Sequence, residues 1–216
     1  MHDPTPLPAY LVRRYRGWRA TAFAENAAWH RRLAEEGQRP RVMAISCCDS
    51  RVQVSTLLGA EPGEFFIHRN IAALVPPHEA GGGVHGTSAA VEYAVTALEV
   101  TNLIVMGHSQ CGGVAGCDAM CRGASPALEA EGSYVGRWMD VLRPGWANVA
   151  HIEDEAERLA ALEREAVLTS LRNLVTFPWV AERMGAGRLA LHGLHIDLAS
   201  GEVEHWDPGA ERFRAV

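Results

Sequence analysis

Two groups of residue types that bind metal ions follow short apolar segments of the chain. Cys47-Cys48-Asp49-Ser50-Arg51 comes after the apolar residues 42–46, and His108-Ser109-Gln110-Cys111 comes after 103–106. One cysteine of the first group, with the histidine and the cysteine of the second, would give zinc a Cys, His, Cys set of ligands. Three protein ligands leave the fourth position of zinc to water, which is typical of a catalytic zinc site.

Both groups also have simpler interpretations. A histidine and a cysteine at this spacing can serve packing or a turn, and Cys47 alone can be a small buried hydrophobic residue. Asp49 and Arg51 favour a site, because a buried carboxylate needs a partner and an arginine two residues on can hold it in a bidentate pair. Cys48 is a rival for Cys47. Neighbouring side chains of an extended chain point to opposite sides, so only one of them can face the metal.

Three further patterns are weaker. Gly81-x-Gly83-x-x-Gly86 has the spacing of a dinucleotide-binding loop, but the prolines at 76–77 stand where a strand is needed, so a glycine hinge is the favoured interpretation. The run from Gly107 to Cys111 is similar to the turn that carries a nucleophilic serine, but its last glycine is replaced by cysteine, which disfavours a serine hydrolase. Cys117 and Cys121 are expected to be two buried thiols rather than a second metal site.

The segments around these groups alternate between strand and helix. This order predicts the α/β class, with a mainly parallel central sheet flanked by helices. Because both groups follow strands, their side chains are expected at the carboxyl edge of the sheet, where open α/β folds bind ligands. The expected elements are strands at 42–46, 64–68 and 103–106, a helix at 87–100, a mostly helical stretch at 125–184, and a C-terminal hairpin of 188–197 with 202–206.

A long helical arm is predicted near the N-terminus, from Tyr10 to Gly37. Its apolar and aromatic residues, among them Tyr15, Trp18 and Trp29, recur on one helical face. So apolar a face is expected to be covered by another surface, either the body of the same chain or a second subunit. The predicted organisation is an N-terminal helical arm over residues 1–37, used for dimerisation, and a single zinc-binding α/β catalytic domain over 38–216.

Composition limits the function classes. The 216 residues are 48% hydrophobic and 21% charged, with a net charge of −6, which disfavours a nucleic-acid-binding protein. No apolar run is long enough for a membrane span, and the first residues lack the pattern of a secretory signal. Five cysteines, an odd number, are typical of a reducing compartment. We therefore expect a cytoplasmic enzyme without nucleic-acid or membrane partners.

Taken together, the motifs resemble the β-class carbonic anhydrases, of the plant-like type with an open site. The resemblance covers residues 35–207, and the motifs keep the order and intervals of the family. It rests on the segments 38–40, 46–52, 61–64, 69–72, 91–95 and 107–113.

The resemblance implies an activity and a set of site residues. The activity is the reversible hydration of carbon dioxide to bicarbonate and a proton, by a zinc-bound hydroxide that an Asp-Arg dyad assists. One zinc ion per chain would be bound by Cys47, His108 and Cys111, with water or Asp49 as the fourth ligand. Asp49 and Arg51 would form the dyad. Carbon dioxide and bicarbonate would bind at Gln38, Phe66, Tyr93 and the backbone amide of Gly112.

The resemblance also implies self-association, as a dimer or a tetramer with active sites at the subunit interface. Some relatives close their site when bicarbonate binds a second pocket of tryptophan, arginine and tyrosine. Here Ala44 stands at the tryptophan position, Arg69 remains, and no tyrosine occurs at 194–196. We therefore expect an open site at neutral pH, with Asp49 paired to Arg51.

Two other functions fit the same residues. Carbonyl sulfide and carbon disulfide are isosteres of carbon dioxide, so a hydrolase of either compound could use the same scaffold. A zinc-thiolate protein that senses bicarbonate or redox state without turnover is suggested by Cys48 beside a ligand cysteine. The intact Asp49 and Arg51 pair favours catalysis over sensing.

Overall fold

The computed structural model describes residues 5–79 and 85–216, so the glycine hinge expected at 81–83 lies outside the described residues. The chain forms two compact units, Met1–Arg39 and Pro40–Val216. No helix in the described ranges is both long and apolar enough to cross a membrane.

The N-terminal unit contains three consecutive helices where the sequence predicts one. These are α1 (Ala9–Ala20), α2 (Ala22–Glu25) and α3 (Ala27–Glu36). The breaks fall at Thr21 and Asn26, whose side chains donate to the carbonyls of residues four positions earlier, at 2.9 Å and 3.0 Å. Short polar side chains of this kind compete with the helical backbone for its hydrogen bonds. The last helix ends before Gly37, which has a φ of +76°, as the sequence predicts.

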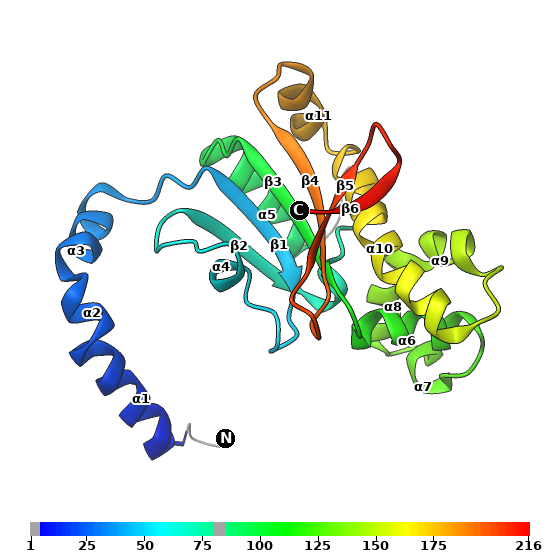
Figure 1. The fold of residues 1–216 in the computed structure, drawn as a ribbon, viewed down its shortest axis with the longest axis horizontal. Coiled ribbons are helices and arrows are strands. Elements are labelled where there is room, and N and C mark those ends of the chain that lie inside the picture. Colours follow the sequence, from blue (N-terminus) through cyan, green and yellow to red (C-terminus); the bar gives the residue numbers. More distant parts are fainter. Residues whose placement is uncertain (1–4, 80–84) are drawn as a thin grey trace. The chain divides into compact units, whose positions relative to one another are not determined.

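The second unit is built on a six-stranded sheet in the order β2-β1-β3-β4-β5-β6 (Figure 1). The first four strands in this order are parallel, and the last two pairs are antiparallel. This architecture confirms the predicted α/β class. The strands are β1 (Val42–Cys47), β2 (Phe65–Asn70), β3 (Asn102–His108), β4 (Ala190–Ile196), β5 (Val203–Asp207) and β6 (Arg212–Ala215).

The predicted C-terminal hairpin is extended by β6 into three antiparallel strands. This strand has a single large apolar residue, Phe213, whose ring lies 5.4 Å from that of Trp206 on β5. A short and mostly polar edge strand carries too weak an alternation to be identified from the sequence. It pairs only with β5.

Helices surround the sheet, and two of them, at 54–57 and 112–121, are not among the predicted elements. The predicted helical stretch at 125–184 is divided into five helices, and the helix predicted at 87–100 differs in form. The helix predicted at 87–100 is α5 (Gly86–Glu92) followed by a π-helical turn at Tyr93–Ala97. Thr96 donates its hydroxyl to the Glu92 carbonyl at 2.7 Å, a bond that disturbs a regular helix. The others are α4 (Val54–Leu57), α6 (Gly112–Cys121), α7 (Pro126–Glu129), α8 (Tyr134–Met139), α9 (Arg143–Val149), α10 (Glu155–Leu174) and α11 (Pro178–Gly185), with short 3-10 turns at Ile71–Ala73 and Asp140–Leu142.

The long helix α10 packs unusually close to β3 and β4. A Cβ added to Gly107 on β3 would lie 2.8 Å from Val167 on α10, and one added to Gly193 on β4 would lie 2.9 Å from the same side chain. Both glycines are therefore needed for this close approach. The core on this face of the sheet includes Met43, Ile45, Leu103, Val105 and Val167.

Candidate metal centre

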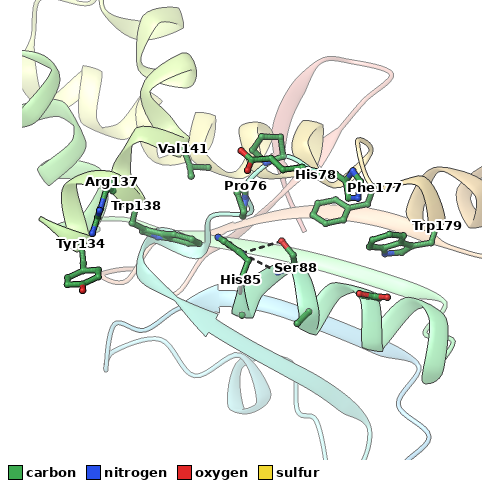
Figure 2. A pocket seen from close by; sticks show the side chains of 15 residues that line it. Pro76, His78, His85, Ser88, Tyr134, Arg137, Trp138, Val141, Phe177 and Trp179 are labelled. Atoms are coloured by element: carbon green, nitrogen blue, oxygen red, sulfur yellow. Dashed lines mark hydrogen bonds between the residues drawn. The ribbon is translucent and has the colours of Figure 1, made fainter. Parts of the chain in front are cut away.

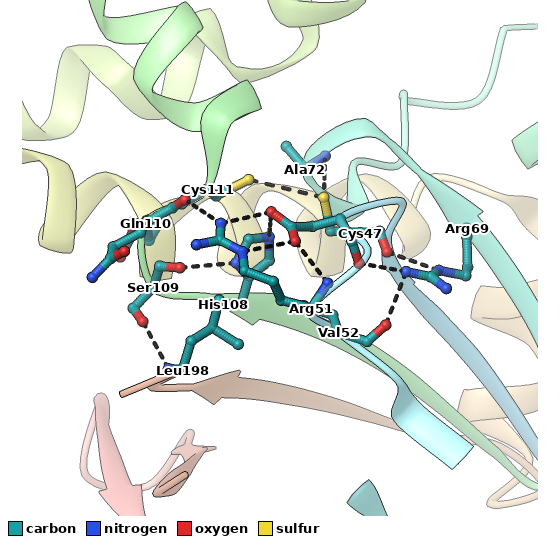
Figure 3. A network of polar contacts seen from close by, with 12 residues as sticks. Cys47, Arg51, Val52, Arg69, Ala72, His108, Ser109, Gln110, Cys111 and Leu198 are labelled. Carbon is teal, nitrogen blue, oxygen red and sulfur yellow. Dashed lines mark hydrogen bonds and ion pairs between the residues drawn. The ribbon is translucent and has the colours of Figure 1, made fainter. Parts of the chain in front are cut away.

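Two neighbouring parallel strands bring the metal-binding residues to one edge of the sheet. β1 ends at Cys47, β3 ends at His108, and Cys111 directly precedes α6. The three side chains are buried, and their possible ligand atoms lie within 4.8 Å of one another. The two sulfur atoms are 4.0 Å apart (Figure 3). The cluster predicted from the two sequence motifs is thus assembled in the fold.

The imidazole of His108 is oriented to bind a cation. Its Nδ1 lies 2.9 Å from the carbonyl oxygen of Ser109, and a proton on Nδ1 makes this a hydrogen bond. The lone pair is then left on Nε2, which is buried and has no hydrogen-bond partner among the described residues. Metal-binding histidines are typically fixed in this way by a bond from the other ring nitrogen. Two Zn–S bonds of about 2.3 Å at a tetrahedral angle place the sulfurs about 3.8 Å apart, so the cluster fits one zinc ion.

Hydrogen bonds to Cys47 favour its thiolate form. The thiol of Cys111 is a hydrogen-bonding neighbour of its sulfur at 4.0 Å, and the N–H of Ala72 donates to it at 3.4 Å. These bonds, with that to Cys111 the largest, outweigh the effect of burial and lower the pKa of Cys47 to about 4. Thiolates rather than thiols bind metals, so this residue is prepared for the role.

A carboxylate is held beside the cluster by a bidentate ion pair. Arg51 donates through Nε and Nη2 to the two oxygens of Asp49, at 2.9 Å and 2.7 Å, and its backbone N–H also donates to Oδ1 at 2.9 Å. These bonds hold the pKa of Asp49 well below its usual range. Oδ2 of Asp49 lies 4.0 Å from Nε2 of His108. A carboxylate whose ionised form Arg51 favours therefore lies beside the cluster.

Arg69 braces the loop that carries these residues. From the end of β2 it donates to the carbonyls of Cys47, Asp49 and Val52, at 2.9 Å, 2.7 Å and 2.9 Å. The sequence suggested Arg69 only as part of a bicarbonate pocket and gave no sign of this role. The structure shows that its guanidinium is already bonded to the main chain around the site.

The comparison with known families agrees with this geometry. The family model described as carbonic anhydrase matches residues 42–203, three quarters of the chain. The chain belongs to the carbonic anhydrase family. Both metal-binding groups lie inside the matched range.

Curated relatives and solved structures place it in the β class. The chain is 34% identical over 191 residues to beta carbonic anhydrase 3 of Arabidopsis thaliana. The aligned segment covers 86% of this chain and 71% of that protein. With mitochondrial beta carbonic anhydrase 6 of the same plant it shares 38% identity over 174 residues, 78% of this chain and 57% of the relative. The β-carbonic anhydrase CcaA has a TM-score of 0.87 at 30% identity, over 96% and 91% of the two chains. A tetrameric β-carbonic anhydrase of Sordaria macrospora has a TM-score of 0.74 at 30% identity, over 91% and 94%.

Family membership and the donor set together identify the cofactor. β-carbonic anhydrases use zinc, and the buried Cys, His, Cys cluster could hold one such ion. The predicted zinc cofactor is therefore confirmed.

The remaining cysteines of this carbonic anhydrase lie outside the cluster. The N–H of Cys48 donates to the Asn70 carbonyl at 2.8 Å, and the Cys48 side chain is exposed. Its exposure beside the buried Cys47 agrees with the alternation expected of an extended chain. Cys117 and Cys121 lie on α6 with their sulfurs 4.0 Å apart. In the described part of the chain they have no third ligand close by.

The predicted substrate residues occupy three different places. Gly112 is the first residue of α6, directly after Cys111. Phe66 and Tyr93 pack against each other with ring centroids 5.8 Å apart. Phe66 on β2 pairs with Met43, which lies four residues before Cys47 at the end of β1. Within one chain, Phe66 is therefore about 13 Å along the strand direction from the level of Cys47. Gln38 belongs to the N-terminal unit.

A cavity of about 980 Å³ has aromatic and imidazole side chains in its wall beside aliphatic and charged ones (Figure 2). None of the residues Cys47, His108 and Cys111 lines it. A hydrogen bond links this wall to the backbone near Cys47. Trp138 donates its Nε1–H to the Ile71 carbonyl at 2.8 Å, and the next residue, Ala72, donates to the sulfur of Cys47. The wall includes His78, His85, Tyr134, Trp138, Phe177 and Trp179.

Proposed function

We propose that this chain catalyses the reversible hydration of carbon dioxide to bicarbonate, with one zinc ion held by Cys47, His108 and Cys111. One observation carries the proposal: a buried Cys, His, Cys cluster with an unpartnered Nε2 stands next to a carboxylate that an arginine keeps ionised. When bound, zinc supplies a Lewis acid that lowers the pKa of a coordinated water. The chain's own residues then orient the reactants.

The carboxylate of Asp49 directs the attacking oxygen. Because Arg51 keeps its pKa low, Asp49 accepts a hydrogen bond from the attacking group and does not take up its proton. The bidentate pair fixes the direction of that bond, so that a lone pair of the attacking oxygen faces the carbon of the substrate. Arg51 also donates to the Gln110 carbonyl at 3.1 Å, which joins the dyad to the loop of the ligand Cys111.

The negative charge that develops on the oxygens of bicarbonate is stabilised by hydrogen-bond donors. The backbone N–H of Gly112 lies in the first turn of α6, where helix amides are not used by the helix itself, and we assign it this role. Gln38 is proposed as a second donor. Phe66 and Tyr93 are proposed as the apolar wall of the pocket for the uncharged substrate.

Self-association would complete this pocket. Phe66 and Tyr93 are too far along the sheet to reach their own metal centre, and Tyr93 is 50% exposed. We propose that they face the metal centre of a partner subunit in a dimer or tetramer. The aromatic residues Tyr15, Trp18 and Trp29 of the N-terminal unit are exposed as well, and deletion of residues 1–36 should weaken association in sedimentation. A fully active monomer would contradict this proposal.

An open site at neutral pH is proposed on two observations. Asp49 is paired to Arg51, and the Arg69 guanidinium is bonded to three carbonyls, so it is not free to bind bicarbonate. Ala44, at the position of the tryptophan in the regulated relatives, is fully buried. A second pocket that lacks these side chains would bind bicarbonate no better in the closed state than in the open one. Bicarbonate then cannot shift the population toward the closed state. Activity should therefore rise with pH as a single titration.

Stopped-flow hydration with a pH indicator, run beside a carbonyl sulfide assay, tests the proposed activity. The zinc-loaded chain should hydrate carbon dioxide, and Asp49→Asn should lose most of this activity while it keeps its zinc. Hydrolysis of carbonyl sulfide without hydration of carbon dioxide would establish the alternative enzyme. Zinc binding with neither activity would indicate a sensor.

A cytoplasmic location is also proposed, since all five cysteines are free thiols, as in a reducing compartment. One relative is named as mitochondrial. Cell fractionation with an antibody to the chain distinguishes the two locations.

A further inference from the structure

The peptide bond between Gln110 and Cys111 is held from both sides by charged side chains. Its carbonyl accepts from Nη2 of Arg51 at 3.1 Å, and its N–H donates to Oε1 of Glu163 at 3.2 Å. The φ of Gln110 is +57°, a conformation that residues other than glycine rarely adopt. Such a conformation persists only where the surroundings enforce it. The side chains of Arg51 and Glu163 hold the peptide in this conformation, directly before the side chain of Cys111.

Glu163 reaches this peptide because α10 approaches the sheet so closely. The missing side chain of Gly107 leaves the space next to Val167 and the Glu163 carbonyl. Glu163 itself is buried, with 6% of its surface exposed. A carboxylate at this depth is costly unless polar partners surround it, which points to a specific role.

A second buried residue faces Glu163 from β4. Nε2 of His195 lies 3.5 Å from Glu163 Oε2, and its Nδ1 lies 3.7 Å from Oε2 of Glu204 on β5. Glu204 in turn pairs with Arg164 at 2.6 Å. The proposed dyad uses none of these four side chains. His195 thus lies between the carboxylates of Glu163 and Glu204, and the partly exposed pair of Glu204 and Arg164 lies beyond it.

We propose that Glu163 is a positioning residue for the metal centre, which holds Cys111 in place through its backbone N–H. This inference rests on the proposed role of Cys111 as a zinc ligand. Loss of the carboxylate releases one side of the peptide, so that the sulfur of Cys111 samples positions outside the coordination sphere. Residues that orient metal ligands typically change metal affinity by about 10- to 100-fold.

The test measures zinc release from the loaded protein to a chromogenic chelator. Glu163→Ala should release zinc at least about tenfold faster than the wild type. Glu163→Gln should release it at an intermediate rate, because an amide oxygen still accepts the N–H bond. The matched control is Glu165→Gln on the same helix, whose carboxylate contacts Asn148 and Arg172 instead. It should match the wild type.

Two further measurements separate positioning from general stability. The thiolate-to-metal absorption of the cobalt-substituted protein should shift in the Glu163 variants and not in Glu165→Gln. The melting temperature of the metal-free protein should be unchanged in Glu163→Gln, while the increase produced by zinc becomes smaller. A purely structural role would lower both melting temperatures equally and leave the cobalt spectrum unchanged, and that would overturn the proposal.

The outcomes also separate this inference from the proposed function. If Cys111→Ser keeps its zinc, the proposed metal site is wrong. If Cys111→Ser loses zinc while both Glu163 variants release it at the wild-type rate, only the positioning role is wrong. Should Glu163→Ala fail to fold, Glu163→Gln decides: release at the rate of Glu165→Gln overturns the inference.

Discussion

The described residues contain two pairs of cysteines whose sulfurs are equally far apart, and one of these pairs belongs to a group that could hold a metal ion. Cys47 and Cys111 are separated by 4.0 Å, and so are Cys117 and Cys121 on α6. Cys47, Cys111 and Cys117 belong to the same buried cluster, and the partly buried Cys121 packs against it. The distance between two thiols therefore does not by itself make a metal site.

The difference lies in what surrounds the sulfurs. The first pair has His108 as a third ligand and bonds to Cys47 that lower its pKa to about 4. In the second pair, burial raises the pKa of both thiols, and Cys117 donates to the Met139 carbonyl at 3.7 Å. Hydrogen-bond donors to the Cys47 thiolate and an unpartnered imidazole nitrogen therefore distinguish the first pair of cysteines from the second. The following predictions test this contrast.

The largest effect is expected from removal of a ligand. Cys111→Ser should reduce the zinc content from about one ion per chain to almost none, with a loss of activity of at least about 10³-fold, because the Lewis acid is lost with the metal. Cys117→Ser and Cys48→Ser should keep the zinc and the activity of the wild type. Zinc content is measured by atomic emission and activity by stopped-flow. A Cys117→Ser protein without zinc would break the contrast between the pairs.

A smaller loss is expected when the metal stays and the dyad is broken. Arg51→Gln should lower kcat by about 10²-fold, because Asp49 loses the partner that fixes its direction. Its zinc content should remain near one ion per chain. Equal activity in Arg51→Gln and wild type would show that the ion pair is not used in catalysis.

The two pairs should differ in the pH dependence of alkylation after removal of zinc by a chelator. Cys47 has a lowered pKa of about 4 and is already a thiolate at pH 6, so its rate with iodoacetamide should stay constant between pH 6 and 8. Cys121 has a raised pKa, so its rate should increase about tenfold per pH unit. Peptide mass spectrometry resolves the two sites. A pH-dependent rate at Cys47 would indicate that its neighbours do not stabilise the thiolate.

The smallest effect is expected in stability. Cys117→Ala removes a fully buried thiol from the packing of α6 and should lower the free energy of unfolding by about 1 kcal/mol, with zinc content and activity unchanged. Cys48→Ala, at an exposed position, should change it by less than about 0.5 kcal/mol. Urea unfolding of the zinc-loaded protein measures both. A larger effect at Cys48 would contradict the burial assigned to the two thiols.

Several elements could be predicted because their patterns are local. The apolar runs at 42–46 and 103–106 became β1 and β3, and the glycine at 37 ends the last helix of the N-terminal unit. The breaks at Thr21 and Asn26 and the edge strand β6 could not. They depend on side-chain hydrogen bonds and on pairing with a distant strand, which leave no periodic signal.

By itself, the sequence was enough to predict which residues could hold a metal ion and where they meet: Cys47, His108 and Cys111 stand at the ends of two strands, with Asp49 and Arg51 directly after the first. Only the tertiary structure decided which groups hold these residues. Glu163 is 52 residues from Cys111 in the sequence, and Arg69 stands on a different strand from the carbonyls it binds. The physical reason is that strand order and helix packing create such contacts between distant segments, whereas sequence spacing records only neighbours along the chain.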